Sequence, residues 1–102
     1  EPLTVVEPGY QTRDFVHVSD VVYANILATQ RDLEEYGQVF NIGTGEGTEI
    51  QTIADLISDY QITIPQRSGE VMHSTANIDK VTEILGWKWS VKVIEWVRKN
   101  LK

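Results

Sequence analysis

The chain contains no cysteine, so neither a disulfide framework nor a metal site built on thiolates can form. Its two histidines, His17 and His73, are far apart in the sequence and do not make a metal site by themselves. No apolar run approaches the length of a membrane span, so no membrane partner is expected. Acidic residues outnumber basic ones by 15 to 9, and the net charge of −6 argues against a nucleic acid as partner. These absences favour a cytoplasmic globular protein and still allow one small phosphate site.

The glycines do not form the fingerprint of a dinucleotide site. Such a site needs the pattern G-x-G-x-x-G at a strand-to-helix turn, so that the backbone and the helix N-terminus can approach a pyrophosphate. Gly43 and Gly45 match the first two positions, but Thr48 stands where the last glycine is needed. We therefore expect no dinucleotide cofactor to bind to this chain alone.

The first sixty residues predict alternating strands and helices. Short apolar runs rich in β-branched and aromatic residues predict strands over residues 3–6, 15–18 and 39–42. Ser19 is a good N-cap for a helix that ends in a polar run, followed by a loop over residues 33–38. The order strand, helix, strand, helix favours an α/β layer with parallel strands.

A second helix is predicted from the segment Thr48-Glu49-Ile50-Gln51, which matches a capping box. The apolar residues of this helix recur at helical spacing and predict one buried face, made of Ile50, Ile53, Ala54 and Ile57. An irregular stretch is expected to follow it.

The C-terminal third predicts two more helices. Asn77 can cap a helix that ends at Gly86, because glycine suits the left-handed conformation after a helix. Ser90 can cap the last helix, in which a buried stripe is expected from Ile94, Val97 and Leu101. The tryptophans of this region are expected to serve packing, since each buries a large area; they are Trp87, Trp89 and Trp96.

Arg13 and Asp14 stand at the mouth of the predicted strand over residues 15–18. A guanidinium offers five donors in a rigid fork and stays charged, so Arg13 can hold a phosphate bidentately while Asp14 orients it. The alternative interpretation is an ordinary surface ion pair, which contributes little in water. For His17, packing or surface exposure is favoured over catalysis.

Four blocks of sequence occur in the order known from one enzyme family. They are QTRDF at 11–15 with V-x-D-V-V at 18–22, FNIGTG at 40–45, P-x-R-x-G-E at 65–70, and A-N-I-D-K at 76–80 with LGW at 85–87. With these blocks the chain resembles the C-terminal part of an extended short-chain dehydrogenase/reductase. The resemblance is to the NAD-dependent nucleotide-sugar epimerase/dehydratase family, whose UDP-glucose 4-epimerases are most similar.

The resemblance implies a substrate site and a fold. Arg13 and Arg67 would lie on either side of the nucleotide-sugar diphosphate, and Glu70 would accept hydrogen bonds from the ribose hydroxyls. Gly69 would let the backbone come close to the ligand. The implied fold is the α/β substrate-binding part of a Rossmann-type enzyme, with short strands and about four helices. Its function would be to hold the diphosphate of a UDP-sugar while C4 is oxidised and reduced.

Catalytic and cofactor residues of the family are missing from the sequence. The family needs a Tyr-x-x-x-Lys pair, and none of the four tyrosines is followed by lysine four positions on. The chain also begins at Glu1 rather than at methionine. We therefore expect residues 1–102 to be one substrate-binding domain fragment of a longer enzyme. The NAD-binding Rossmann domain is absent, so the fragment is expected to bind no cofactor and to be inactive alone.

Other interpretations of the chain stay open. A nucleotide-sugar 4,6-dehydratase or reductase would share these blocks, and a non-catalytic interaction module would act through its tryptophan-rich surface. The expected partners are the nucleotide sugar and the missing Rossmann domain, and exposed apolar surface would favour self-association. Only residues 60–64 separate the second helix from Pro65, which predicts that one strand of the family is trimmed.

Overall fold

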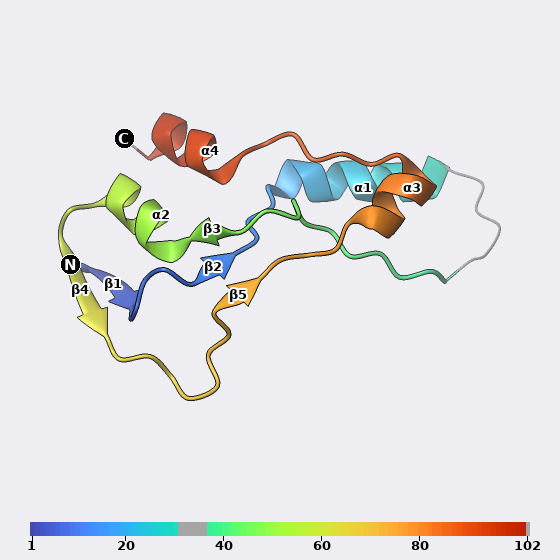
Figure 1. Ribbon diagram of the computed structural model, residues 1–102. Coiled ribbons are helices and arrows are strands. Elements are labelled where there is room, and N and C mark those ends of the chain that lie inside the picture. The colour runs from blue at the N-terminus through green and yellow to red at the C-terminus, as the bar shows by residue number, and fades with distance from the viewer. Residues whose placement is uncertain (31–36, 102) are drawn as a thin grey trace.

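The computed structural model describes residues 1–30 and 37–101 as a flat, elongated α/β chain with extents of 50 × 33 × 18 Å (Figure 1). The elements are β1 (Leu3–Val6), β2 (Thr12–Arg13), α1 (Val18–Gln30), β3 (Thr48–Glu49), α2 (Ile50–Ile57), β4 (Gln61–Ile64), β5 (His73–Ser74), α3 (Asp79–Leu85) and α4 (Val93–Asn100). The predicted class, short strands with about four helices, is confirmed over the described residues. The predicted loop over residues 33–38 lies mostly outside them.

β1 and β4 form a parallel two-stranded sheet at one end of the molecule (Figure 1). Leu3 is in register with Gln61, and Val6 with Ile64. The prediction of an irregular stretch after α2 is therefore wrong at β4. Four residues are enough for a strand here, because β1 supplies the hydrogen-bonding partners that local sequence does not reveal.

α2 contacts β1, and its four apolar residues line a pocket together with that strand. The predicted buried face is only partly correct, because Ala54 is buried, Ile50 and Ile53 are half-buried, and Ile57 is 38% exposed.

A second, three-stranded sheet has the order β3-β2-β5, and each of its strands is two residues long. β2 runs antiparallel to β3 and parallel to β5. The prediction of a strand over residues 15–18 is wrong, since the strand ends at Arg13 and α1 already begins at Val18. Neither β3 nor β5 extends far enough to pair with Phe15. Phe15 therefore has no partner strand, although aromatic residues favour strands.

The predicted strand over residues 39–42 is also wrong, because these residues pair with no strand in the described part of the chain. Phe40 and Ile42 instead pack against the apolar cluster between α1 and α3, while Val39 is 77% exposed. Lys80 covers this segment, with its Nζ 4.9 Å from the centre of the Phe40 ring and 2.8 Å from the carbonyl oxygen of Val39. The apolar pattern thus reports packing rather than strand pairing.

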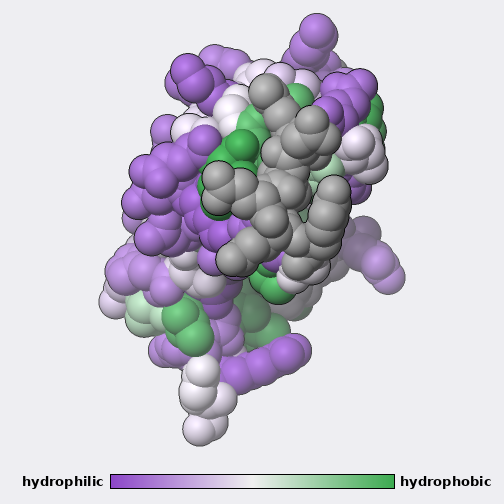
Figure 2. All heavy atoms as spheres, turned by 90° about the vertical axis from the view of Figure 1, so that its right-hand side faces the viewer, coloured by the Kyte–Doolittle hydropathy of each residue, from purple (hydrophilic) through white to green (hydrophobic). Residues whose placement is uncertain are grey.

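The main core joins α1, α3 and the segment after α3. Its buried members are Ala24, Leu27, Val81, Leu85 and Trp87. The Trp87 side chain is fully buried, and its indole N–H donates to the carbonyl of Asp20 at 2.9 Å. The packing role predicted for this tryptophan is confirmed. At the surface of this end, small apolar patches lie among mostly polar residues (Figure 2), and α1 exposes Val22, Tyr23 and Ile26.

The predicted helix caps are only partly correct. Gly86 has the left-handed φ of 69° expected after α3. Ser19 lies inside the first turn of α1, and it is the Nδ1 of His17 that accepts the N–H of Ser19, at 3.0 Å. The Oδ1 of Asn77 accepts the N–H of Asp79, but the cap position itself is Ile78.

The capping box and the Ser90 cap are wrong. Thr48 belongs to β3, and α2 begins at Ile50 without a side-chain cap. α4 begins at Val93, and Ser90 hydrogen-bonds to Asp20 instead. These polar side chains serve tertiary contacts, which local capping rules do not anticipate. In the stripe of α4, Val97 is buried and Ile94 partly buried, whereas Leu101 follows the helix and is 47% exposed.

Among residues 1–30 and 37–101, no helix has the length and apolar character needed to cross a membrane.

Candidate functional site

Arg13 ends β2, and its guanidinium already has two partners. Nη1 donates to the carbonyl of Thr12 at 2.8 Å, and Nη2 lies 3.4 Å from the Oε1 of Glu70. The side chains of Arg13 and Glu70 are 31% and 18% exposed. Two of the three residues predicted to bind the ligand are therefore in contact, although they are 57 positions apart in the sequence.

Arg67 and Glu70 belong to the loop over residues 65–72, which connects β4 to β5 (Figure 1). The N–H of Glu70 donates to the carbonyl of Arg67 at 3.2 Å, which closes a turn. Gly69 has a φ of 81°, a conformation that side chains disfavour, and the space around it is open. Arg67 is exposed. The loop thus presents Arg67 to solvent while Glu70 ties it to β2.

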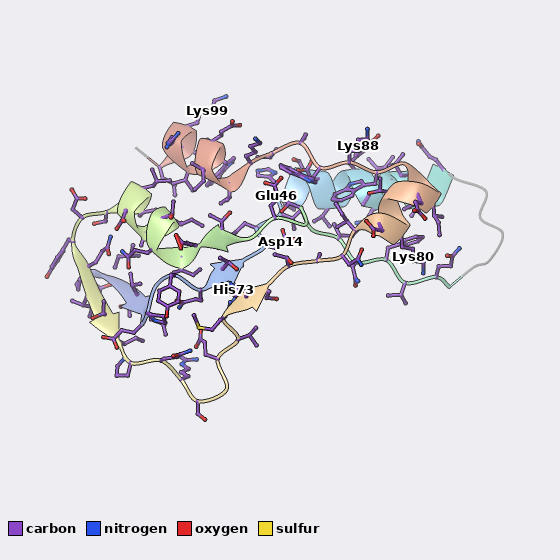
Figure 3. All side chains as sticks on the ribbon, viewed as in Figure 1. Asp14, Glu46, His73, Lys80, Lys88 and Lys99 are labelled. Atoms are coloured by element: carbon purple, nitrogen blue, oxygen red, sulfur yellow. The ribbon has the colours of Figure 1, made fainter. Side chains whose placement is uncertain are left out.

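The Asp14 side chain hydrogen-bonds to other segments of the chain and not to the Arg13 side chain. Its carboxylate accepts four hydrogen bonds, from the N–H of Thr44 at 2.8 Å, the hydroxyl of Thr44 at 2.7 Å, the N–H of Gly45 at 2.9 Å and the N–H of Ala76 at 3.1 Å. Figure 3 shows Asp14 where the chain after β2, the turn at residues 43–46 and the chain after β5 come together. Asp14 therefore braces the segments around Arg13, rather than orienting its guanidinium.

Gly43 makes this junction possible. A Cβ at this position would lie 2.7 Å from both the Cβ of Ala76 and the Oδ2 of Asp14. Gly47 is also close to its surroundings, since a Cβ there would lie 2.9 Å from the Oγ1 of Thr12. Both glycines are therefore required for packing of the chain against itself.

A groove of about 530 Å³ opens beside this junction. Its lining residues are Arg13, Asp14, Phe40, Asn41, Ile42, Ser74, Thr75, Ala76 and Asn77. Arg13 supplies its positive charge, and the hydroxyls of Ser74 and Thr75 add hydrogen-bonding groups. With Asp14 the lining also carries a carboxylate, so the groove as a whole is polar and offers a cation at Arg13. Among the described residues, no cluster of His, Asp and Glu could hold a metal ion.

Asp20 is a buried carboxylate that the sequence analysis did not single out. It is 3% exposed and accepts from the N–H of Ser90 at 3.0 Å, the hydroxyl of Ser90 at 2.9 Å and the N–H of Val91 at 3.0 Å. The signal was present in the V-x-D-V-V block, where an acidic residue interrupts an apolar run. Asp20 thereby anchors the segment after Trp87 to the first turn of α1.

Both carboxylates have a lowered pKa. Desolvation by burial acts on each to raise the pKa, but hydrogen bonds to the charged form outweigh it. For Asp14 these bonds come from Thr44, Ala76 and Gly45. For Asp20 they come from Ser90 and Val91, and the charge of His17 adds to the effect. Each aspartate therefore stays ionised in the fold at a pH where it would be protonated in the unfolded chain.

This difference predicts how stability depends on pH. The unfolded chain binds protons more tightly at these two sites, so their stabilising contribution is complete above about pH 5. It is lost as the pH falls below the ordinary value of 3.8 toward the lowered pKa of Asp14 and Asp20. Urea unfolding at pH 7, 5, 4 and 3 should show a constant free energy of unfolding down to about pH 5 and a steep fall below it. An equal free energy at pH 5 and pH 3 would contradict this assignment.

His17 lies apart from the groove at Arg13. Its Nδ1 is 2.8 Å from the hydroxyl of Ser19, and its ring centre is 6.0 Å from that of Trp96. These contacts agree with the packing role that the sequence favours. His73 lies on β5 with its Nδ1 2.9 Å from the Oγ1 of Thr12, and both side chains belong to the sheet that carries Arg13 (Figure 3).

The fold is similar to about a third of the chain of solved Rossmann-type α/β enzymes. The UDP-glucose 4-epimerase of Thermotoga maritima, solved with UDP-glucose, superposes with a TM-score of 0.81 at 36% identity. The match covers 99% of this chain and 34% of that enzyme.

Comparison of sequences leads to the family. Residues 1–43 match the model of the NAD-dependent epimerase/dehydratase family. The putative UDP-glucose 4-epimerase of Methanocaldococcus jannaschii is 35% identical over 105 residues, which cover 90% of this chain and 33% of the relative. The dTDP-L-rhamnose 4-epimerase of Burkholderia thailandensis is 34% identical over 98 residues, which cover 88% and 27%. The chain is thus similar to members of this family and spans about a third or less of the length of these relatives.

Proposed function

We propose that this chain is the substrate-binding part of an NAD-dependent nucleotide-sugar 4-epimerase. Arg13 and Arg67 bind the diphosphate, and Glu70 accepts hydrogen bonds from the ribose. The observation that carries this proposal is the position of Arg13, which lies on the groove and also holds the loop bearing the other two residues. Two guanidinium groups can bracket a diphosphate through charge-assisted, bidentate hydrogen bonds.

The dinucleotide belongs, in this proposal, to the part of the longer protein outside this chain. The glycine-rich segment at residues 43–47 does not fit a pyrophosphate, because Gly43 is packed against Ala76 and Asp14, and Gly47 against Thr12. The contribution of this chain to the reaction is anchoring. The diphosphate does not take part in the reaction at C4. Binding energy gained there positions the reacting carbon and still leaves the sugar ring free to turn.

Calorimetric titration with UDP and UDP-glucose tests the two arginines. Arg13→Ala and Arg67→Ala should each weaken binding by about 1.5–3 kcal/mol, the contribution of a charge-assisted hydrogen bond. Arg98→Ala is the matched control, because Arg98 is an exposed arginine on α4 and does not line the groove. The same titrations in the longer protein would show whether the site needs the rest of the enzyme.

The proposal fails if both substitutions leave the affinity equal to that of Arg98→Ala. In that case Arg13 and Arg67 are surface residues, and an interaction module becomes the favoured interpretation of the chain. The choice among epimerase, 4,6-dehydratase and reductase depends on catalytic residues that this chain does not carry. It is tested by identifying the product of the longer protein.

A further inference from the structure

Three segments that are far apart in the sequence form the walls of the groove at Arg13. They are residues 13–14, 40–42 and 74–77. The short sheet fixes only part of this arrangement, because the pairing of β2 with β5 ends at Arg13 and Ser74. Residues 40–42 and 75–77 lie outside the strands. Beyond the sheet, a different interaction has to hold the walls at a fixed separation.

The carboxylate of Asp14 supplies this interaction. Its Oδ1 accepts the N–H and the hydroxyl of Thr44, which follows the wall at residues 40–42. Its Oδ2 accepts the N–H of Gly45 and that of Ala76, which belongs to the wall at residues 74–77. Each oxygen thus has two donors, and one side chain ties all three walls together where they meet (Figure 3). Hydrogen bonds to an ionised acceptor are about twice as strong as neutral ones.

The walls are closely packed at this junction. Thr44 is buried, and a Cβ at Gly43 would lie 2.7 Å from both Ala76 and the Oδ2 of Asp14. Close packing leaves the segments little room to relax, so a loss of bonds at Asp14 shifts one wall relative to the others. The groove groups that such a shift moves are the guanidinium of Arg13 and the hydroxyls of Ser74 and Thr75.

The same four donors argue against direct binding of the ligand by Asp14. Its charge is already compensated by hydrogen bonds from the chain itself, and an ionised carboxylate accepts but does not donate. An anionic ligand therefore gains nothing from contact with Asp14. Any effect of this residue on binding has to act through the groups that it holds in place.

We infer that Asp14 is a positioning residue of the groove. It holds the three walls at the separation at which Arg13 and the wall hydroxyls reach one diphosphate together. This inference rests on the proposed function, and it goes further because it assigns part of the affinity to a residue that does not touch the ligand.

Calorimetric titration with UDP compares Asp14→Asn with Asp20→Asn. An amide keeps one acceptor oxygen but turns an N–H toward the other pair of donors, so one wall loses its tie. Asp14→Asn should therefore bind UDP about tenfold more weakly than the wild type, the loss of one charge-assisted hydrogen bond. Asp20→Asn is the matched control, because Asp20 accepts three hydrogen bonds in the same way but does not line the groove. Its affinity should stay within about twofold of the wild type.

A milder pair of variants keeps the test valid if Asp14→Asn does not fold. Thr44→Val removes the hydroxyl that donates to Asp14 and keeps the N–H and the shape of the side chain. It should weaken UDP binding about two- to threefold. Ser90→Ala removes the corresponding hydroxyl at Asp20 and should leave the affinity unchanged.

A double-mutant cycle distinguishes positioning from a general loss of stability. If Asp14 acts by placing Arg13, Asp14→Asn should cost about tenfold in the wild type but less than about threefold in Arg13→Ala. Circular dichroism at the temperature of the titration shows that each variant is folded. A general loss of stability would instead weaken binding by the same factor with and without Arg13.

The outcomes separate the two proposals. If Arg13→Ala leaves the affinity for UDP unchanged, the proposed function itself fails. If Arg13→Ala weakens binding, but Asp14→Asn and Thr44→Val cost no more than their controls, only the positioning role is overturned. Equal costs of Asp14→Asn with and without Arg13 would overturn it as well.

Discussion

Replacing Asp20 by alanine is expected to lower the free energy of unfolding by about 3–5 kcal/mol. The substitution removes the acceptor of three hydrogen bonds, two of them from the N–H groups of Ser90 and Val91. These N–H groups are partly buried, and each one left without a partner costs up to about 1–3 kcal/mol. A domain of this size has a total stability of only about 5–15 kcal/mol, so the loss would be visible in urea or thermal unfolding.

Two further variants define the cause of this loss. Asp20→Asn keeps one acceptor oxygen but turns an amide toward the donors, so its effect should fall between those of the wild type and alanine. Asp59→Ala removes an exposed aspartate between α2 and β4 and should change the stability by less than about 0.5 kcal/mol. If Asp20→Ala and Asp59→Ala are equally stable, Asp20 does not anchor the segment after Trp87.

Trp87→Ala is expected to destabilise the chain by about 3–5 kcal/mol, the cost of truncating a large buried aromatic side chain. Trp87 is fully buried in the cluster between α1 and α3, and its indole also donates to Asp20. The substitution therefore creates a cavity and leaves a carbonyl without its donor. Chemical unfolding followed by circular dichroism measures the change, because this signal does not depend on the tryptophan removed.

Trp96→Ala is the matched control for this prediction. Trp96 is 38% exposed on α4, so the same truncation removes less buried area and should cost clearly less than Trp87→Ala. Equal losses for the two variants would show that the cluster around Trp87 is not the main source of stability.

The arrangement of the candidate site depends on contacts across the sequence. Sequence blocks pointed to Arg13, Arg67 and Glu70, and the family assignment that they implied is supported by the comparisons. They did not indicate that Arg13 and Glu70 contact each other, because the contact joins residues 57 positions apart. The prediction that Asp14 orients Arg13 is wrong for the same reason. The four hydrogen bonds of Asp14 come from segments about 30 and 62 positions away.

By itself, the sequence determined the features that depend on neighbouring residues. The apolar face of α2 and the left-handed Gly86 follow from helical spacing and from the conformational freedom of glycine. Only the tertiary structure decided which apolar runs become strands. Residues 61–64, expected to be irregular, pair with β1, whereas Phe40 and Ile42 of a run predicted as a strand pack against a helical core. The reason is that a strand is stabilised by hydrogen bonds to a partner distant in sequence, and the presence of that partner is a property of the whole fold.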